Sequence, residues 1–417
     1  MTDSSSTDAA DRQRLVVLIG SVVLLLISAG GMFLVVVALK EMAMEFGWPR
    51  SIPSFAFSLQ FIGSGFGGMI MGYVLDRYGF GGPALIGTLM VSFGAMLVSE
   101  ITAAWQLYVL YGIMFGLAGQ GSLAAPALAN IARWYDEKRG MAVGIASSGQ
   151  ALAGIVWPPI FGYVLLTLGW RDMFFWYGVF ALCVMLPVCL VVRRKPPAYV
   201  APEPGTAGAS AERQSTTGPV RQPLTSQQIQ WALSAAIIGC CVAMSLPLGH
   251  LVSHVTDLGH PIGDAVNVLS VMLMAAFVSR AVILGLLSDR VGALRTMFIF
   301  SIVQACMLGL FTVVDSLLAL YAVAILCGLG YGGLFPIYAV ATREHLPIHE
   351  VGRRTGTIFL FGAVAMGLGS WMGGYLFDLT GSYTLPFLIG VAINLTNLVI
   401  VALLILRIRP PLAFRLA

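Results

Sequence analysis

The sequence predicts an all-α membrane protein in which twelve transmembrane helices form two pseudo-symmetric halves of six. Three observations lead to this fold class. Of the 417 residues, 58% are hydrophobic and only 10% are charged, whereas soluble domains carry about 25% charged residues. Apolar stretches of about 20 residues, long enough to cross a bilayer, recur along the chain. Matching motifs also recur about 213 positions apart, which indicates two related halves.

Each apolar stretch is interpreted as one helix. The twelve helices are expected over residues 15–39, 51–75, 82–101, 104–131, 141–168, 171–192, 229–256, 264–287, 293–314, 316–342, 355–379 and 383–406. The first helix follows a polar tail, residues 1–14. Its apolar run is about 25 residues long and lacks a small-residue cleavage site, so we interpret it as a retained span and not as a signal peptide.

One long polar segment divides the chain. Residues 193–228 are rich in Pro, Gly, Ser and Thr, which is typical of a flexible linker. They separate an N-terminal half, residues 15–192, from a C-terminal half, residues 229–406, and residues 407–417 are expected to form a second tail. Two halves of the same orientation form a parallel repeat, for which a substrate site near the middle of the membrane is expected between the halves.

Lysine and arginine are distributed unevenly along the chain. If both termini lie on one side of the membrane, 19 of the 23 basic residues fall on that side, three lie in the opposite loops, and one, Arg280, lies inside a span. Because positively charged loops stay in the cytoplasm, both termini are expected there. The net charge of +4 therefore reflects membrane topology, and the lipid bilayer is the expected partner in place of a nucleic acid.

The loops after the second and eighth helices carry the same motif, Gly-x-x-x-Asp-Arg-x-Gly. Its residues are Gly72, Asp76, Arg77 and Gly79 in the first half and Gly285, Asp289, Arg290 and Gly292 in the second. The aspartates can bind helix N-termini and nearby arginines, and the glycines permit tight turns. The motif resembles the signature of the major facilitator superfamily. With the twelve helices and the central linker, this resemblance covers essentially the whole chain, and it implies the major facilitator fold with these residues in a cytoplasmic gate.

A second stretch is similar to one family within this superfamily. Residues 135–149, YDEKRGMAVGIASSG, resemble the signature of monocarboxylate transporters that leads into the fifth helix. The Gly30–Gly31 pair and the segment GWRDMFFW fit the same family. The resemblance implies transport of short monocarboxylates such as lactate or pyruvate, commonly with a proton. It places the chain as a bacterial homologue of lactate and pyruvate symporters in the inner (cell) membrane.

A single charge, Arg280, lies inside the otherwise apolar stretch 269–287 of the eighth helix. A guanidinium cannot lose its proton, and an ionisable group within the membrane normally faces a water-filled cavity or a partner. We therefore expect Arg280 to bind an anion, and the alternative is an arginine that pairs with a neighbouring helix. The planar guanidinium of Arg280 can donate two parallel hydrogen bonds to one carboxylate. The resemblance implies the same role, because monocarboxylate transporters carry their carboxylate-binding arginine in this helix.

The sequence departs from the better-known animal members of the family at two positions. They carry an aspartate one turn before the arginine, where this chain has Ala276, and a lysine in the first helix, where this chain has Phe33. Both groups are credited with proton coupling in that family. The coupling groups are therefore expected elsewhere in this chain.

Four further residues are expected at the substrate site. Tyr331 in the tenth helix should lie at the depth of Arg280 and hydrogen-bond a substrate; the alternative is a core tyrosine bonded to a backbone carbonyl. Phe335 and Phe359 are expected to form an apolar wall for the alkyl end of the substrate, with ordinary packing as the alternative. Gln120 is the candidate from the N-terminal half, although hydrogen bonding between helices would also explain it.

The seventh helix ends with His250, His254 and Asp257, whose spacing places them on one face. Three interpretations are open. They can be solvated groups at a helix end, proton-coupling groups, because a desolvated carboxylate titrates toward neutrality, or part of a metal site, for which no fourth ligand is evident. In the proton-coupling hypothesis, Asp257 neutralises Arg280 directly or through water in the empty, outward-open transporter, and protonation of Asp257 frees the arginine for a carboxylate.

The sequence thus predicts a secondary transporter that moves a small monocarboxylate together with a proton by alternating access. The nearest alternative is an exchanger of oxalate, formate or another organic anion in the same fold, and a nutrient receptor is a further one. One intramembrane cation suits one carboxylate, so a monoanion is favoured. No nucleophile–base set or cofactor motif is present, so neither an enzyme nor a cofactor is expected, and no metal site or accessory subunit is assigned.

Overall fold

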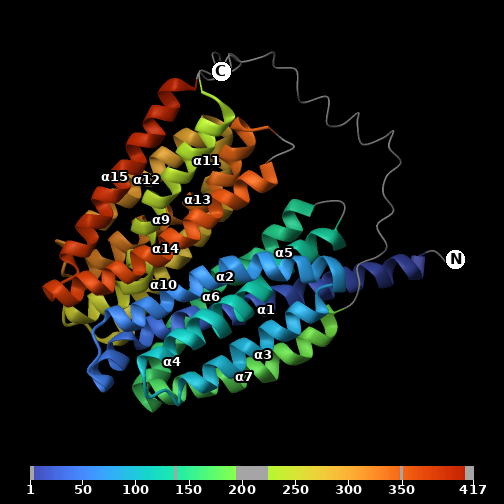
Figure 1. Ribbon diagram of the computed structural model, residues 1–417, viewed down its shortest axis with the longest axis horizontal. Helices are drawn as coiled ribbons and strands as arrows, with labels where there is room; N and C mark the ends of the chain where they lie inside the picture. Colours follow the sequence, from blue (N-terminus) through green and yellow to red (C-terminus); the bar gives the residue numbers. More distant parts are fainter. Residues whose placement is uncertain (1–3, 136–138, 194–223, 348–350, 409–417) are drawn as a thin grey trace.

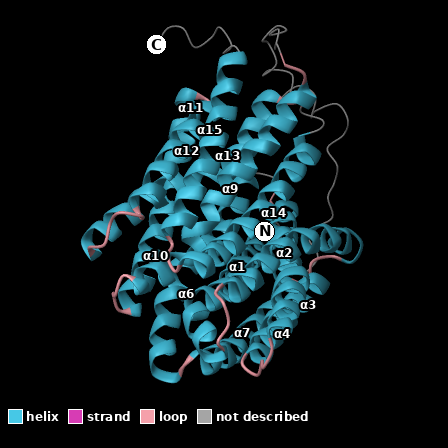
Figure 2. Ribbon diagram, turned by 60° about the vertical axis from the view of Figure 1, so that its left-hand side comes forward, coloured by secondary structure: helices cyan, strands magenta, loops and turns pink. Residues whose placement is uncertain are grey.

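The protein is built from helices. The computed structural model describes residues 4–135, 139–193, 224–347 and 351–408, and within these ranges it contains no strand (Figure 2). Twelve helical segments in the described ranges are long and apolar enough to cross a membrane. The predicted all-α membrane fold with twelve spans is therefore confirmed. Most of the expected linker, residues 194–223, and parts of the two tails, residues 1–3 and 409–417, lie outside the described residues.

Each half of the chain contributes six spans. The N-terminal spans are α1 (Ser4–Phe46), α2 (Ser51–Tyr78), α3 (Gly81–Val98), a composite fourth span of α4 (Ala104–Val109), η1 (Leu110–Gln120) and α5 (Gly121–Trp134), α6 (Arg139–Leu168) and α7 (Trp170–Val192). The C-terminal spans are α9 (Ser226–Asp257), a composite eighth span of α10 (Ile262–Val278), η3 (Ser279–Ile283) and α11 (Leu284–Val291), α12 (Ala293–Leu310), α13 (Leu317–His345), α14 (Val351–Thr380) and α15 (Thr384–Arg407).

Three features differ from the expected helices. The first helix begins at Ser4, because the polar segment before the span contains Ala, Arg and Gln, which favour helix. The seventh begins at Ser226, where Thr225 and Gln228 form a reciprocal cap: each backbone N–H donates to the other's side chain, at 2.9 and 3.3 Å. The expectation of continuous α-helices is wrong for the fourth and eighth spans, which contain the π-helical segments η1 and η3.

The two halves use the same packing scheme. In the N-terminal half, α1 packs on α6 and α7, α2 on η1, and α3 on η1 and α7. In the C-terminal half, α9 packs on α14 and α15, α10 on α13, and α12 on α13 and α15. Each contact in one half has its counterpart in the other, so the internal repeat of the sequence is present in the structure (Figure 1).

Glycines bring equivalent spans into direct backbone contact. A Cβ atom added at Gly116 would lie 2.8 Å from the carbonyl oxygen of Gln60, and one added at Gly328 would lie 2.0 Å from that of Met272. Both the two glycines and their two partners are 212 positions apart. Because no side chain fits at these distances, glycine is required where the helices cross.

The turns repeat as well. In the described part of the chain, the glycines with positive φ form three pairs, 212 or 213 positions apart: Gly47 with Gly259, Gly79 with Gly292, and Gly169 with Gly381. Their φ angles lie between 64° and 92°, where L-residues with a Cβ are strained. The final glycines of the two repeated motifs, Gly79 and Gly292, each end a helix, and each donates its N–H to the carbonyl oxygen four residues earlier.

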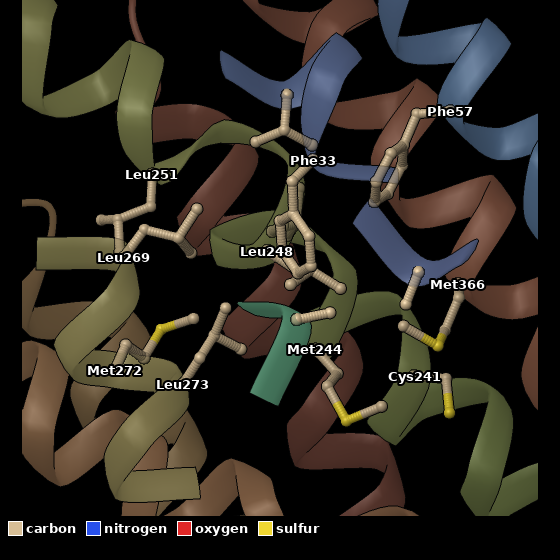
Figure 3. Close-up of a cluster of buried hydrophobic side chains, with 14 of the residues drawn as sticks. Phe33, Phe57, Cys241, Met244, Leu248, Leu251, Leu269, Met272, Leu273 and Met366 are labelled. Atoms are coloured by element: carbon tan, nitrogen blue, oxygen red, sulfur yellow. The ribbon is translucent and has the colours of Figure 1, made fainter. Parts of the chain in front are cut away.

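The halves meet on one side of the molecule and diverge toward the other (Figure 1). We call the side where α7 ends and α9 begins the linker side, and the opposite one the far side. The halves touch mainly where α2 meets α14 and where α6 meets α10. At this contact lies a buried hydrophobic cluster with side chains from both halves, including Phe33, Phe57, Leu248, Leu273 and Met366 (Figure 3).

The replacement Gly332→Ala tests the close contact of α13 with the eighth span. The new Cβ would lie 2.0 Å from the carbonyl oxygen of Ala276, so the helices must move apart, at a cost of about 1–3 kcal/mol. We expect a lower melting temperature for the purified protein. The matched control is Gly144→Ala, because a Cβ there meets no atom within 4 Å and alanine favours helix. Equal melting temperatures for the two variants would show that Gly332 is not in close contact with Ala276.

Candidate functional site

Arg280 lies on the face of the eighth span that contacts the other half. Leu273 and Val266, seven and fourteen positions earlier, lie against Gly154 and Gly162 of α6. Residues seven positions apart share a helix face. Arg280 therefore continues this row toward the linker side, where the two halves have diverged (Figure 1).

The Arg280 side chain is exposed, and one of its three nitrogens has a described partner. Its Nε donates to the carbonyl oxygen of Gly332 in α13, at 3.1 Å. Among the described side chains, no carboxylate forms an ion pair with Arg280. The neighbouring helix thus orients the guanidinium with a carbonyl and leaves Nη1 and Nη2 for two parallel hydrogen bonds to an anion.

The backbone at Arg280 is π-helical and fixed to α13. Ser279, at the start of η3, is buried, and its hydroxyl donates to the carbonyl oxygen of Leu329, at 2.5 Å. Ser279 and Arg280 therefore bond carbonyls three residues apart on the same helix. Short π-helical segments occur frequently at functional sites, and here the segment positions the one charge of the apolar stretch 269–287.

One expected site residue, Tyr331, lies next to this contact, and two others, Phe335 and Phe359, pack on each other. Tyr331 directly precedes Gly332, the partner of Arg280, so the two side chains lie at the same depth. No described residue bonds the Tyr331 hydroxyl, so the alternative of a backbone-bonded tyrosine is not observed. Phe335 and Phe359 stack with ring centroids 4.5 Å apart, and both are half-buried.

Gln120 lies in the other half and makes no described contact with these residues. It ends the π-helical segment η1, and its Oε1 atom is buried without a hydrogen-bond partner in the described part of the chain. The helix-to-helix hydrogen bond considered as an explanation for Gln120 is therefore not observed at this oxygen.

Ala276 and Phe33 occupy positions at which space is limited. Ala276 is buried, and its backbone lies against Gly332, as described above. Phe33 is buried in the cluster between the halves, and a Cβ at Gly154 would lie 3.1 Å from its ring. A carboxylate at the first position or an ammonium at the second would be desolvated in this conformation, which is costly for a charge.

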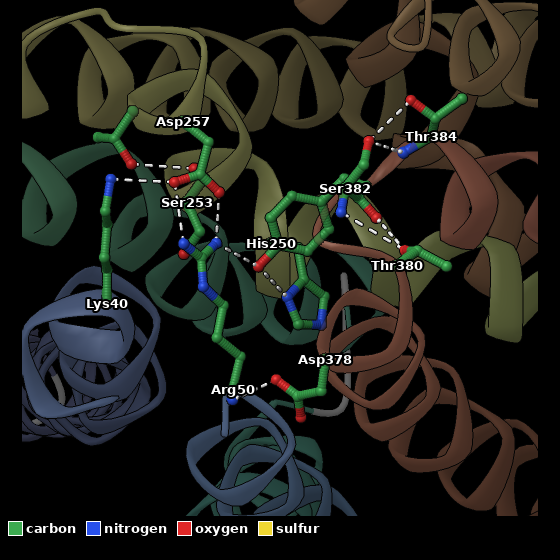
Figure 4. A network of polar contacts seen from close by, with 11 residues as sticks. Lys40, Arg50, His250, Ser253, Asp257, Asp378, Thr380, Ser382 and Thr384 are labelled. Carbon is green, nitrogen blue, oxygen red and sulfur yellow. Dashed lines mark hydrogen bonds and ion pairs between the residues drawn. The ribbon is translucent and has the colours of Figure 1, made fainter. Parts of the chain in front are cut away.

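A second polar group lies on the far side and joins the two halves. Asp257, at the end of α9, is bound by two cations of the N-terminal half (Figure 4). Arg50 donates to both of its oxygens, at 2.5 and 2.9 Å, and Lys40 Nζ lies 3.0 Å from Oδ1. The guanidinium of Arg50 also lies 3.8 Å from the centre of the Phe377 ring, a cation–π arrangement.

The network continues through Tyr383 to His250. Arg50 Nη1 donates to the Tyr383 hydroxyl, at 3.1 Å, and this hydroxyl lies 3.3 Å from His250 Nδ1. His250 Nε2 lies 2.8 Å from the carbonyl oxygen of Ser370. A carbonyl only accepts, so Nε2 carries the hydrogen, and in the neutral ring Nδ1 accepts from Tyr383. The result is a directional chain of hydrogen bonds that runs from Arg50 into the C-terminal half.

The environment fixes the protonation of two members of this chain. Burial by itself lowers the pKa of Arg50, but the hydrogen bonds and charge interactions with Asp257 and Tyr383 together outweigh this effect, and the pKa lies above its ordinary value. Burial raises the pKa of Tyr383 to about 12, although Arg50 lowers it. Near neutral pH the guanidinium therefore stays charged and the phenol stays protonated.

Asp378 provides a separate link between the halves. Its two carboxylate oxygens accept the backbone N–H groups of Arg50, at 2.6 Å, and Ser51, at 2.8 Å (Figure 4). Ser51 is the first residue of α2, so an acid from α14 caps a helix of the other half. A negative charge at a helix N-terminus satisfies free N–H groups and favours the helix dipole.

The histidines are not solvated groups at a helix end. His250 is fully buried and His254 is 7% exposed, because the C-terminal half packs around the end of α9. A metal site is not supported either, because the described residues contain no group of three His, Cys, Asp or Glu side chains that could hold a metal ion. His254 Nε2 lies 3.0 Å from the carbonyl oxygen of Phe311, a different carbonyl from that bound by His250. Of the three interpretations, proton coupling is the one that this geometry leaves open.

The expected pairing of Asp257 with Arg280 is not present in the structure. The carboxylate is bound by Arg50 and Lys40, and Arg280 lies near the linker-side end of its span. Ile262, the far-side end of that span, is 18 positions from Arg280, or about 27 Å along a helix. Two side chains cannot bridge this distance, so the correction is that Asp257 balances the far-side cations.

The repeated motifs lie on the linker side. Arg77 and Arg290 are exposed, and a Cβ at Gly72 would meet no atom within 4 Å. Gly79 and Gly292 end their helices as described above. The side chains of Asp76 and Asp289 and the surroundings of Gly285 lie outside the described residues, and the gating role of the motif stays a prediction.

The sequence analysis missed four members of the far-side network: Lys40, Arg50, Asp378 and Tyr383. One signal could have found two of them. Basic residues are rare in the far-side loops, and all three that occur there form ion pairs: Lys40 and Arg50 with Asp257, and Arg171 with Glu45. The partners of Lys40 and Arg50 lie more than 200 positions away in the chain, beyond the reach of helical spacing.

The variant Asp257→Asn tests whether the far-side network holds the halves together. It removes the charge that pairs with Arg50 and Lys40, at an expected cost of about 1.5–3 kcal/mol, which is a tenfold or greater shift between closed and open far sides. Spin labels at the exposed residues Met44 and Val313, with Cys183 and Cys306 replaced, report the distance between the halves. We expect a population with a longer distance.

Two further variants complete this test. Asp378→Asn should shift the distance distribution in the same direction, because it weakens the cap on α2. Glu45→Gln is the matched control, since it breaks a far-side ion pair with Arg171 inside one half. A distribution that stays unchanged in Asp257→Asn, or that shifts equally in Glu45→Gln, would refute the role of the network.

Comparison with known proteins agrees with this architecture. Monocarboxylate transporter 13 from Bos taurus is 26% identical over 373 residues, which cover 88% of this chain and 82% of the relative. The MFS-type transporter pynF from Aspergillus niger is 27% identical over 311 residues, which cover 74% of this chain and 68% of the relative. The chain is thus similar in sequence to a monocarboxylate transporter and to a fungal transporter.

Solved structures share the fold at low sequence identity. A D-xylose-proton symporter superposes with a TM-score of 0.72 at 13% identity, covering 97% of this chain and 99% of that chain. The nucleoside transporter NupG superposes with a TM-score of 0.73 at 12% identity, covering 94% of this chain and 100% of that chain.

The sequence profile described as Major Facilitator Superfamily matches residues 21–283 and 257–416. With nearly the whole chain matched and the twelve-helix fold in place, the protein belongs to the major facilitator superfamily.

Proposed function

We propose that this membrane transporter carries a small monocarboxylate such as lactate or pyruvate together with a proton, by alternating access. The observation that carries the proposal is the guanidinium of Arg280, which is exposed between the halves with Nη1 and Nη2 unbonded by any described residue. A charge in a membrane span is costly, so a site that leaves it unpaired is suited to an anionic substrate. The similarity to monocarboxylate transporter 13 supports the same class.

The charge of the site favours a monoanion. Arg280 is the one basic residue in the eighth span before the repeated motif, and residues 356–364 of α14 contain none. A dicarboxylate such as oxalate would leave its second charge without a cation. The stacked rings of Phe335 and Phe359 can accept a short alkyl end, and Tyr331 can donate a hydrogen bond to the carboxylate or to a hydroxyl group.

We assign the linker side to the cytoplasm, because most of the basic residues lie there. In this orientation the structure is open toward the cytoplasm and closed toward the outside by the network around Asp257. Arg280 would then exchange substrate with the cytoplasm, and opening the far side would require the Asp257 and Asp378 contacts to break.

Asp257 is the proposed proton-coupling group, and it acts through Arg50 and Lys40 and not through Arg280. A protonated carboxyl no longer balances the charges of Arg50 and Lys40, so protonation from the far side favours opening of that side. The buried chain of Tyr383 and His250 keeps Arg50 oriented toward Asp257. For symport, Asp257 must release its proton to the cytoplasmic side when it pairs with Arg50 and Lys40 again and the far side closes. That proton and a carboxylate bound at Arg280 would then cross together without net charge.

Uptake by purified protein in proteoliposomes tests the role of Arg280. Lactate, pyruvate, formate and oxalate are compared with an imposed pH gradient. In Arg280→Lys, the bidentate geometry is lost, and we expect uptake to fall about tenfold to hundredfold, which corresponds to about 1.5–3 kcal/mol. Near-normal uptake by this variant would show that Arg280 does not bind the substrate. Oxalate as the best substrate would refute the inference that a single cation selects a monoanion.

The same vesicles test Asp257 and separate symport from exchange. Asp257→Asn cannot be protonated, so we expect it to lose accumulation driven by a pH gradient while retaining counterflow of labelled lactate. Uphill uptake by this variant would disprove the assignment. The absence of an acid one turn before Arg280, where Ala276 stands, is the observation that favours a proton-independent anion exchanger. Wild-type counterflow with the gradient collapsed, but no gradient-driven uptake, would establish that alternative.

A further inference from the structure

A pocket of about 410 Å³ lies on the far side between the two halves, next to the network around Asp257. The N-terminal half contributes the end of α1 and the junction of α6 with α7, and the C-terminal half contributes the end of α9 and the start of α10. Its walls include Val37, Lys40, Glu41, Trp170, Thr256 and Ile262. Pockets of 300–1,000 Å³ accommodate drug-sized ligands.

This pocket is separate from the proposed substrate site. Ile262 lines the pocket, and Arg280 lies about 27 Å further along the same span, as estimated above. The buried cluster around Phe33 and Leu273 lies between the two levels. A ligand in the pocket therefore touches neither Arg280 nor Tyr331.

The charges that line the pocket favour a cation. The ammonium of Lys40 is balanced by Asp257, with 3.0 Å between Nζ and Oδ1. Glu41 is half-buried and forms no ion pair with any described residue. The lining also includes His260, whose Nε2 lies 2.7 Å from the carbonyl oxygen of Asp315. Of the two formally charged side chains of the lining, Lys40 and Glu41, only Glu41 lacks an ion-pair partner among the described residues, and its carboxylate would repel an anion.

Polar and apolar groups around Glu41 suit an amine with an apolar body. The Thr256 hydroxyl donates to the backbone of Ser253, at 2.9 Å, so its oxygen can accept a hydrogen bond from an ammonium group. Trp170 donates its Nε1 hydrogen to Glu45, which fixes the ring. The Trp170 ring and the side chains of Val37 and Ile262 provide apolar contact for the rest of a ligand.

We infer that this far-side pocket binds a small organic cation, a protonated amine with an aromatic or branched aliphatic body, with its ammonium on Glu41 and its apolar part against Trp170. The pocket walls come from both halves, so they are complete only while the far side is closed. A ligand that binds one of two conformations shifts the population toward it. Occupation therefore holds the far side closed and inhibits transport without competing at Arg280.

Binding of 2-phenylethylamine to the purified protein, measured by calorimetry, tests the site. The neutral analogue 2-phenylethanol has a similar body without the charge, and we expect it to bind about tenfold or more weakly, the loss typical of a charge-assisted hydrogen bond. Glu41→Gln should lose amine affinity to the same degree. Glu100→Gln is the matched control, because Glu100 is an exposed acid after α3 that does not line the pocket and makes no described contact with Trp170.

Two outcomes would overturn the binding site: equal affinity for the amine and the alcohol, or unchanged amine affinity in Glu41→Gln with the unliganded melting temperature preserved. The conformational part is tested with the spin labels at Met44 and Val313, where the amine should narrow the distribution toward the short distance. An unchanged distance distribution at saturating amine would refute the inference that amine binding holds the far side closed. These measurements require no transported substrate, so their failure is distinguishable from the failure of monocarboxylate transport.

Discussion

The carboxylate of Asp257 is the group on which the observed arrangement of the halves depends. It belongs to the C-terminal half and accepts from Arg50 and Lys40 of the N-terminal half. A partly buried charge is costly unless it is paired, so each of these charges holds the others in place. Beneath them, the hydrophobic cluster between α1, α2, α9, α10 and α14 closes the same contact with apolar surface. Because both layers lie on the far side, the halves separate only toward the linker side, and Arg280 is exposed there.

The two charged regions are built in opposite ways. On the far side, cations and acids from different halves balance one another, and the balance is lost when the halves move. At Arg280, a single helix pair supplies the support: the Gly332 carbonyl orients Nε, and the Ser279 hydroxyl fixes the backbone to α13. Since both partners belong to the C-terminal half, this support persists when the halves move. A gate that depends on conformation is thus combined with a binding group that keeps its geometry.

The sequence predicted the parts of this structure that depend on local pattern. Apolar length gave the twelve spans, and the repeated motifs gave the two halves, because both signals lie within short stretches of chain. Arg280 was found for the same reason, as one charge in an apolar stretch. The far-side network was not, because Asp257 and Asp378 meet Arg50 only after the halves associate, and a single sequence carries no trace of such distant pairs. The spacing of His250 and His254 was read from the sequence, but their burial depends on α12, α14 and α15, which hydropathy alone does not orient.

The π-helical segments also record how the two halves diverged. Up to Gln60 and Met272 the halves correspond with an offset of 212 positions, but from Gly72 and Gly285 the offset is 213. The extra residue of the C-terminal half thus falls between Met272 and Gly285, where η3 lies. The fourth span shows the reverse change: α4 and α13 begin 213 positions apart, Gly116 and Gly328 are 212 apart, and η1 lies at the change. A wider helical turn absorbs a single inserted residue without altering the length of a span. Arg280 therefore lies in the segment where the C-terminal half has one residue more than the N-terminal half, and the helix around the site differs in phase by that residue between the two copies of the bundle.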